Sequence, residues 1–127
     1  TELGAQAQLA ACLAAGNRAL FVRNEASAAL AAFTPSGQRD SIELAPEDVL
    51  YRPQAYQAVL CEGDAAAVIR CHQVVAALDG PIVAFQGLSS EALQRGERYE
   101  PRLLARERSI SVNTAAVGGN ANLLAMD

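Results

Sequence analysis

The chain has 127 residues, enough for one domain with a sizeable core, and 51% of them are hydrophobic. Three Phe, three Tyr and no Trp leave Ala, Leu, Val and Ile to build that core, which favours helices packed on a sheet over an aromatic-centred β-sandwich. The net charge is −4 and all ten cations are arginine, which excludes lysine-based chemistry and provides no basic stripe for nucleic acid.

No apolar run reaches the length of a membrane span, and no basic-then-apolar leader opens the chain, so we expect a cytoplasmic protein without membrane insertion. Cys12, Cys61 and Cys71 form an odd set without CxxC spacing, which argues against a disulfide framework and against a zinc site. The sole methionine is Met126, which is typical of a piece cut from a longer polypeptide.

Hydrophobic periodicity predicts alternating helices and strands in the first half of the chain. The expected elements are a helix over residues 2–15 ended by Gly16-Asn17, a strand over 19–22, a helix over 25–33 broken at 34–37, a weak strand over 41–44 and a helical turn over 46–51. In the second of these helices, Ala26, Ala29, Leu30 and Phe33 are expected to share the buried face.

The second half continues this alternation. It predicts a strand over residues 57–61, a helix over 65–78 capped by Asp64, a turn at 79–81, a strand over 82–85, a helix to about residue 95 capped by Ser89 or Ser90, and a final strand over 106–112. The buried face of the long helix is expected to carry Val68, Cys71, Val75 and Leu78.

Strands that alternate with helices are typical of an α/β fold, here a Rossmann-like, mostly parallel sheet with helices on both faces. We assign residues 1–98 to this α/β part and residues 99–127 to a C-terminal strand or flap and tail, within a single domain overall.

Few side chains are candidates for catalysis. His72 is the only histidine, and it adjoins Cys71 in the predicted helix, where neighbours point about 100° apart and cannot pair as base and nucleophile. A surface histidine is therefore expected. Cys61 ends a strand, where catalytic groups are often placed, but no activating partner is visible beside it.

The tail from Ser111 onward is the most distinctive stretch. Gly118 and Gly119 permit close backbone contact, Asn113 and Asn120 offer amide donors and acceptors, and Leu123-Leu124 can anchor an apolar end. The plain alternative is a frayed Ala/Gly-rich terminus.

Three segments resemble the NAD-binding domain of aldehyde dehydrogenases: Leu13-Ala14-Ala15-Gly16-Asn17-Arg18-Ala19-Leu20-Phe21, Gln57-Ala58-Val59-Leu60-Cys61-Glu62-Gly63 and Gly80-Pro81-Ile82-Val83-Ala84-Phe85-Gln86-Gly87. The closing Ser111-Val112-Asn113-Thr114-Ala115-Ala116-Val117-Gly118-Gly119-Asn120-Ala121 resembles the C-terminal motif of the long forms of the proline utilization A (PutA) family, bifunctional flavoenzymes with a second, degenerate aldehyde-dehydrogenase-like domain.

Departures from the aldehyde dehydrogenase pattern imply that this domain is not catalytic. Active aldehyde dehydrogenases hold the adenosine ribose of NAD with a Lys-Pro-Ser-Glu segment, and this chain has Val22-Arg23-Asn24-Glu25 in its place. Only Glu25 and the turn glycine Gly63 therefore remain as vestigial cofactor positions. The general-base glutamate falls near Phe85 or Gln86, neither of which can accept a proton at neutral pH. The family's catalytic cysteine belongs to a domain that this chain lacks.

The resemblance implies a parent enzyme that oxidises proline on FAD to Δ1-pyrroline-5-carboxylate, and then oxidises L-glutamate γ-semialdehyde to glutamate with NAD. This domain would bind neither cofactor. It would pack on the catalytic aldehyde dehydrogenase domain of the same polypeptide, and its tail would seal the substrate channel. The tail residues assigned to this lid are Ser111, Asn113, Thr114, Gly118, Gly119, Asn120, Leu123 and Leu124.

Two alternatives remain open. The chain could be a regulatory domain that still binds NAD, with Glu25 on a ribose and the Glu62-Gly63 turn near the cofactor. It could also be a stand-alone module that self-associates through the tail into a homo-oligomer. The resemblance further allows a parent that lies peripherally at the inner membrane face.

Overall fold

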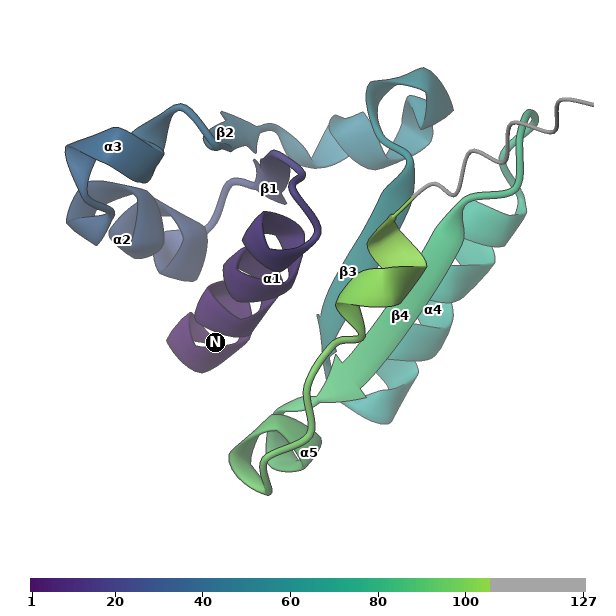
Figure 1. The fold of residues 1–127 in the computed structure, drawn as a ribbon. Coiled ribbons are helices and arrows are strands. Elements are labelled where there is room, and N and C mark those ends of the chain that lie inside the picture. Colours follow the sequence, from purple (N-terminus) through teal and green to yellow (C-terminus); the bar gives the residue numbers. More distant parts are fainter. Residues whose placement is uncertain (106–127) are drawn as a thin grey trace, which may run out of the picture.

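The computed structural model describes residues 1–105, which form two β-α-β units on either side of one helix (Figure 1). The elements are α1 (Glu2–Ala14), β1 (Ala19–Val22), α2 (Glu25–Phe33), α3 (Ser36–Arg39), β2 (Ile42–Ala45), the 3-10 helices η1 (Glu47–Tyr51) and η2 (Pro53–Ala55), β3 (Ala58–Gly63), α4 (Ala65–Ala76), β4 (Ala84–Ser89), α5 (Ser90–Gln94) and the 3-10 helix η3 (Pro101–Leu104). Among these described helices, none has the length and apolar character needed to cross a membrane.

Helix α1 begins and ends where the sequence predicts. Thr1 caps it, its hydroxyl accepting a hydrogen bond from the Gly4 amide at 3.0 Å. At the other end Gly16 adopts φ 71°, and the amides of Gly16 and Asn17 bond back to the carbonyls of Leu13 and Cys12 at 3.0 and 2.9 Å. This pair of bonds is a Schellman motif, which needs the left-handed conformation that glycine supplies.

Each β-α-β unit holds one pair of parallel strands, which confirms the α/β class. In the first unit, β1 pairs with β2 so that Ala19 lies opposite Ile42 and Val22 lies opposite Ala45, and α2 and α3 form the crossover. In the second, β3 pairs with β4, and α4 connects them after its cap, Asp64, accepts a bond from the Ala67 amide at 2.6 Å. Among residues 1–105, the four strands thus form two small sheets.

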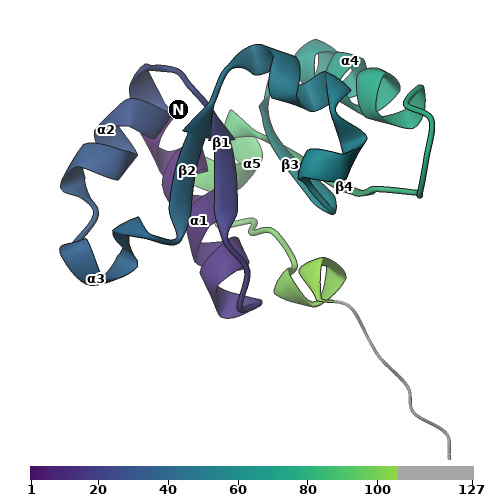
Figure 2. The ribbon, with the colours of Figure 1, turned by 90° about the horizontal axis from the view of Figure 1, so that it is seen from above.

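The two halves of the core meet on α1, which lies beside β3 in Figure 1 and behind the β1–β2 pair in Figure 2. Ala5 and Leu9 pack against Ala19 and Phe21 of β1. On the other side of the helix a second cluster forms around Ala11, and its members are Leu93, Tyr99, Leu60, Leu88 and Leu104. Small side chains on α1 therefore let one helix contact both sheets closely.

The sheet of β3 and β4 is covered on both faces. Helix α4 packs so closely on one face that a Cβ at Gly87 would collide with the Val68 side chain. On the opposite face, Leu60 and Leu88 join the cluster around Ala11 of α1. The expected buried face of α4 is confirmed, since Val75 is buried and Val68, Cys71 and Leu78 are half-buried.

Two expectations about burial and boundaries are wrong. In α2, Ala26 and Leu30 pack against the core as expected and Ala29 is half-buried, but Phe33, the last residue of the helix, is 88% exposed. The fully buried side chain of α2 is Ser27, whose hydroxyl donates to the carbonyls of Val22 and Asn24. The strand expected over residues 82–85 begins only at Ala84 and runs to Ser89, and Ile82 is fully exposed. Pro81 lacks the amide that a ladder needs, which delays pairing. The strand expected over residues 106–112 lies outside the described residues.

Leu93 is 1% exposed and anchors the cluster around Ala11, whereas Leu103 is 60% exposed in η3. We expect Leu93→Ala to lower the free energy of unfolding by about 2–5 kcal/mol, because it removes buried methyl groups and leaves a cavity. Leu103→Ala, the matched control, should change it by no more than about 0.5 kcal/mol. Urea denaturation of residues 1–127 measures both values, and equal losses in the two variants would contradict this account of the core.

Candidate functional site

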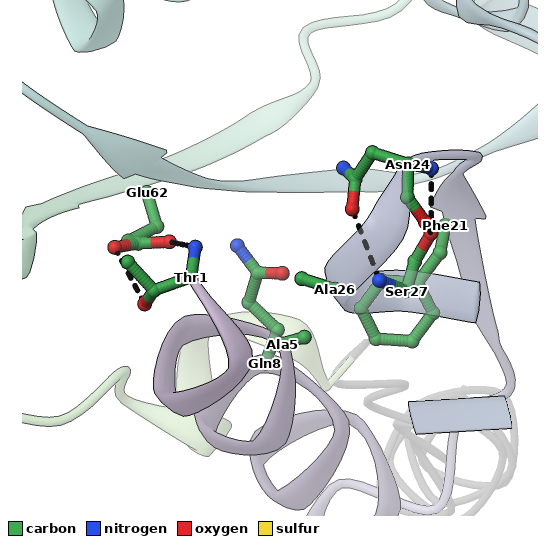
Figure 3. Close-up of a pocket in the computed structure, with 8 residues that line it drawn as sticks. All are labelled: Thr1, Ala5, Gln8, Phe21, Asn24, Ala26, Ser27 and Glu62. Atoms are coloured by element: carbon green, nitrogen blue, oxygen red, sulfur yellow. Dashed lines mark hydrogen bonds and ion pairs between the residues drawn. The ribbon is translucent and has the colours of Figure 1, made fainter. Parts of the chain in front are cut away.

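A cleft of about 130 Å³ lies where the carboxyl ends of β1 and β3 approach the first turn of α1 (Figure 3). Ligands of open α/β folds commonly bind at the carboxyl ends of parallel strands, which makes this cleft the first candidate site. The residues that line it are Thr1, Ala5, Gln8, Phe21, Asn24, Ala26, Ser27 and Glu62.

Asn24 and Ser27 form the wall of the cleft that belongs to α2. Asn24 caps the helix, its side-chain oxygen accepting from the Ser27 amide at 3.0 Å. The Ser27 hydroxyl in turn accepts from the Asn24 amide at 2.9 Å, which completes a reciprocal capping box. The polar atoms on this side of the cleft are therefore already used to hold the start of α2 in place.

Glu62 is the acidic group that lines the cleft, and both oxygens of its carboxylate accept hydrogen bonds from within the domain. Its side chain is 7% exposed. One oxygen accepts from the Thr1 hydroxyl at 2.9 Å and from the Ser90 hydroxyl, and the other accepts from the Thr1 backbone nitrogen at 2.6 Å. Burial alone would raise the pKa of Glu62, but these hydrogen bonds outweigh it and hold the pKa below its ordinary value.

Gly4 shows how tightly Glu62 is packed. A Cβ at Gly4 would collide with the Glu62 carboxylate, so this position of α1 accepts no larger residue without moving that side chain. The carboxylate thus lies against the first turn of α1, where the free amides and the helix dipole favour a negative charge. Glu62 therefore occupies the part of the cleft that would otherwise attract an anion.

A network of hydrogen bonds lies next to the cleft and joins α1 to β3. The Gln8 amide nitrogen donates to the Leu60 carbonyl at 3.3 Å and to the Tyr99 hydroxyl at 3.4 Å. Tyr99 donates its own proton to the Cys61 carbonyl at 2.8 Å. Burial raises the pKa of Tyr99 to about 12, although the bond from Gln8 opposes this shift. The phenol is therefore neutral at physiological pH and acts as a structural donor.

The two vestigial cofactor positions border this cleft without lining it. Glu25 is exposed at the start of α2, next to Asn24, and Gly63 ends β3, next to Glu62. An added Cβ at Gly63 would lie 3.0 Å from the Ala67 Cβ, which is close packing against α4. The structure thus brings both positions to the same end of the fold.

The cysteines and the histidine are not arranged as a catalytic pair. Burial, with smaller contributions from Cys71 and Glu62, raises the pKa of Cys61 to about 12, and burial also raises that of Cys12. Both are therefore thiols at neutral pH, and neither is an activated nucleophile. His72 is exposed, as expected, and its ring packs on Phe85 with a centroid separation of 4.8 Å.

Gln86, near which the resemblance places a general base, holds the backbone of a neighbouring segment. Its amide nitrogen donates to the Glu100 carbonyl at 3.0 Å, and its oxygen accepts from the Glu100 amide at 2.8 Å. The eight tail residues assigned to a lid, Ser111 to Leu124, lie outside the described residues.

The cleft does not fit a dinucleotide. Its volume is well below the roughly 300–1,000 Å³ of ordinary ligand sites, and a phosphate entering it would face the Glu62 carboxylate. In the part of the chain that the structure describes, no three His, Cys, Asp or Glu side chains are grouped as metal ligands.

Sequence reasoning placed Glu62 in a turn where a cofactor would approach, but it did not foresee the bonds of Glu62 to Thr1 and Ser90, and it missed Gln8 and Tyr99 as partners across the domain. Their role depends on contacts between residues as far apart as Thr1 and Glu62 or Gln8 and Tyr99, which no local pattern reveals. The role of Asn24 could have been predicted from the sequence, since an Asn-x-x-Ser step before a helix is a recognisable cap.

Comparison with known proteins gives one consistent group of relatives. The chain is 40% identical over 126 residues to the bifunctional protein PutA of Escherichia coli, 39% over 126 residues to that of Salmonella typhimurium and 35% over 136 residues to that of Rhizobium meliloti. These matches cover 97–99% of this chain but only 9–10% of each relative. The chain is therefore homologous to one segment of PutA, and it spans about a tenth of the length of these relatives. No family model and no solved structure gives a significant match.

The lowered pKa of Glu62 predicts a specific acid sensitivity. Because the folded-state pKa lies below the ordinary value of 4.5, the carboxylate stabilises the fold above that pH, and this contribution is lost as the pH falls through the lowered value. Glu62→Gln should lower the free energy of unfolding at pH 7 by about 1–3 kcal/mol, because an amide nitrogen replaces one of the two oxygens that accept from Thr1 and Ser90. It should also make stability less dependent on pH in that acid range.

Urea denaturation of residues 1–127 at several pH values measures both effects. Glu47→Gln is the matched control, since Glu47 is exposed and does not line the cleft. A Glu62→Gln variant whose stability follows the unsubstituted chain at every pH would contradict the role assigned to Glu62.

The filled cleft also predicts that NAD leaves the melting temperature of residues 1–127 unchanged at millimolar concentration. A site with a dissociation constant one hundredth of the NAD concentration would add about 2.7 kcal/mol of stability. For a domain of this size that corresponds to a rise of several degrees. Thermal denaturation with increasing NAD tests this, and a saturable rise in melting temperature would favour the regulatory NAD-binding hypothesis.

Proposed function

We propose that residues 1–127 are the non-catalytic C-terminal domain of a bifunctional PutA enzyme, in which they support the aldehyde dehydrogenase domain and help to seal the substrate channel. The observation that carries this proposal is the homology of nearly the whole chain to a segment of PutA. The cleft filled by the chain's own Glu62 supports the non-catalytic part of it.

On this proposal the chemistry belongs to other domains of the parent. One oxidises proline by transferring two electrons and two protons to FAD, which yields Δ1-pyrroline-5-carboxylate. Hydrolysis opens that ring to L-glutamate γ-semialdehyde, and the aldehyde dehydrogenase domain oxidises the semialdehyde to glutamate with NAD as hydride acceptor. Residues 1–127 bind neither cofactor and take part in neither oxidation.

The described surface is suited to covering by another domain. Six large apolar side chains are at least 40% exposed, namely Leu3, Phe33, Tyr51, Ile69, Ile82 and Leu103. They come from separate elements, α1, α2, η1, α4, the loop before β4, and η3. Exposed apolar groups mark contacts with other protein surfaces where they lie together in one patch. The catalytic aldehyde dehydrogenase domain of the same polypeptide is the partner that we assign to them.

The tail beyond the described residues supplies the seal in this proposal. Its small and amide side chains, from Ser111 to Asn120, permit close contact with another surface, and Leu123-Leu124 give it an apolar anchor. A closed passage raises the chance that the intermediate reacts before it diffuses away, without altering either oxidation. Nucleic acid is not a partner of this domain on the same proposal, and the parent is cytoplasmic.

The regulatory NAD-binding hypothesis remains the second candidate, because the cleft lies at the carboxyl ends of β1 and β3, where a nucleotide would approach. The buried negative charge of Glu62 opposes it.

Deleting this domain should uncouple the two reactions of the parent. We expect the enzyme without residues 1–127 to show a lag before NADH forms from proline, because the intermediate must build up in solution. Proline oxidation, followed with an artificial electron acceptor, should be unchanged. Stopped-flow recording of NADH after proline and NAD are mixed with the enzyme measures the lag.

A second deletion, of residues 106–127 alone, separates the tail from the α/β part. A lag in both deletions assigns sealing to the tail, whereas loss of semialdehyde oxidation only in the larger deletion assigns support of that domain to residues 1–105. If neither deletion alters the lag or either separate rate, the proposed function is wrong.

A further inference from the structure

We propose that Cys61 and Cys71 are a redox-active cysteine pair, which a small disulfide such as oxidised glutathione converts reversibly into a covalent bond between β3 and α4. In the described structure both are free thiols, and both side chains are half-buried. The pair stands apart from the proposed function, since its reaction involves neither proline nor NAD.

The direction of the Cys61 side chain follows from the alternation of side chains along β3. Its neighbours Leu60 and Glu62 both face α1. Cys61 therefore points to the opposite face of the sheet, which α4 covers (Figure 1). Gly63, two residues further along, shows how close this contact is, because an added Cβ there would lie 3.0 Å from the Ala67 Cβ of α4.

Cys71 lies on the face of α4 that packs on the same sheet. Val68 precedes it by three residues and Val75 follows it by four, which are the spacings that place side chains on one face of a helix. Val75 is buried, and a Cβ at Gly87 would collide with Val68. Gly87 lies opposite Cys61 in the pairing of β3 with β4. The inward face of α4 thus meets the sheet next to Cys61.

The lengths of strand and helix bring the two cysteines to the same level. Cys61 lies three residues before Asp64, which is about 10 Å of strand. Cys71 lies seven residues after Asp64, which is about 10 Å of helix. As the crossover between two parallel strands, α4 runs back against the direction of β3, so the two lengths cancel. The same count places Val59 level with Val75, and both are buried.

The acidity of Cys61 reflects this neighbour. Burial raises the pKa of Cys61, and the charge of Cys71, a hydrogen bond with the Cys71 side chain and the charge of Glu62 raise it further, to about 12. Cys61 is therefore a thiol at neutral pH, and we assign the first attack on the oxidant to Cys71. Once Cys71 is bonded to another sulfur it carries no charge, so that its part in suppressing ionisation of Cys61 is lost.

The reaction is a thiol–disulfide exchange in two steps. The Cys71 thiolate attacks one sulfur of oxidised glutathione, the sulfur–sulfur bond of the oxidant breaks, and one glutathione thiolate leaves. Cys61 then gives its proton to solvent and attacks the Cys71 sulfur, which releases the second glutathione. Two protein thiols are oxidised to one disulfide, and one oxidised glutathione is reduced to two molecules of glutathione.

Folding and closure of this bond favour each other. In the folded chain β3 and α4 already hold the two sulfurs together, whereas an unfolded chain must lose conformational entropy to close the loop from residue 61 to residue 71. The equilibrium constant for closure should therefore be larger in the folded chain than in the unfolded one. This ratio separates a pair positioned by the fold from two cysteines that are merely near in sequence.

The test uses the Cys12→Ser variant of residues 1–127, in which only the proposed pair remains. It is equilibrated with mixtures of reduced and oxidised glutathione, with and without denaturing urea, and free thiols are then trapped with N-ethylmaleimide. We expect mass spectrometry of the folded chain to show one intrachain bond and no attached glutathione. The equilibrium constant for closure should exceed that in urea by about ten-fold or more.

Cys61→Ser and Cys71→Ser are the matched controls, since each removes one member of the pair and keeps Cys12. Cys12 packs with Leu9 and Phe21 in the cluster on the β1 side of α1. Both controls should therefore acquire glutathione without forming an intrachain bond. Melting temperatures under reducing conditions show which variants fold. If Cys12→Ser does not fold, peptide mapping of the oxidised unsubstituted chain identifies the bonded cysteines in its place.

Three results would overturn the pair. One is a folded chain that keeps both thiols, or carries glutathione on them, at the most oxidising mixture. Another is an equilibrium constant for closure that exceeds the value in urea by less than about ten-fold. The third is an intrachain bond that includes Cys12. None of these results would alter the proposed function, whose test follows NADH formation from proline.

Discussion

The contact that the rest of the described structure depends on is the close approach of α1 to both sheets. Ala5 and Leu9 face β1 and Ala11 faces the cluster around Leu93, so that one helix closes two cores. A bulky residue at either alanine would force the two β-α-β units apart, because interiors packed to this density have no space to absorb added volume. Alanine at these two positions is thus a packing requirement.

The same closeness accounts for the candidate site. When α1 lies against β3, Gly4 leaves room for the Glu62 carboxylate and the first turn of the helix supplies favourable partners for it. An open cleft at the ends of β1 and β3 and a tightly docked α1 are therefore competing arrangements. In this fold the docked helix and its carboxylate occupy the space, and the cleft that remains is small.

Much of the fold could be predicted from the sequence, because the signals for it are local. Gly16-Asn17 and Asp64 mark helix ends through the backbone conformation and the cap that they provide, and the structure confirms both. The prediction for Phe33 was wrong because Phe33 is the last residue of α2, beyond the part of the helix around Ala26 and Leu30 that packs on the core. The division into two strand pairs and the partners of Glu62 arise from tertiary contacts, which periodicity does not contain.

The polar groups near the strand ends share one feature that bears on function. Glu62 bonds to Thr1 and Ser90, Gln86 to the backbone of Glu100, and Tyr99 to the backbone of Cys61. A catalytic site needs at least one such group with a free donor or acceptor directed toward substrate. Here each is used to join elements that are distant in sequence. The polar groups near the strand ends therefore act as cross-links that hold β3, β4 and α1 in their described positions.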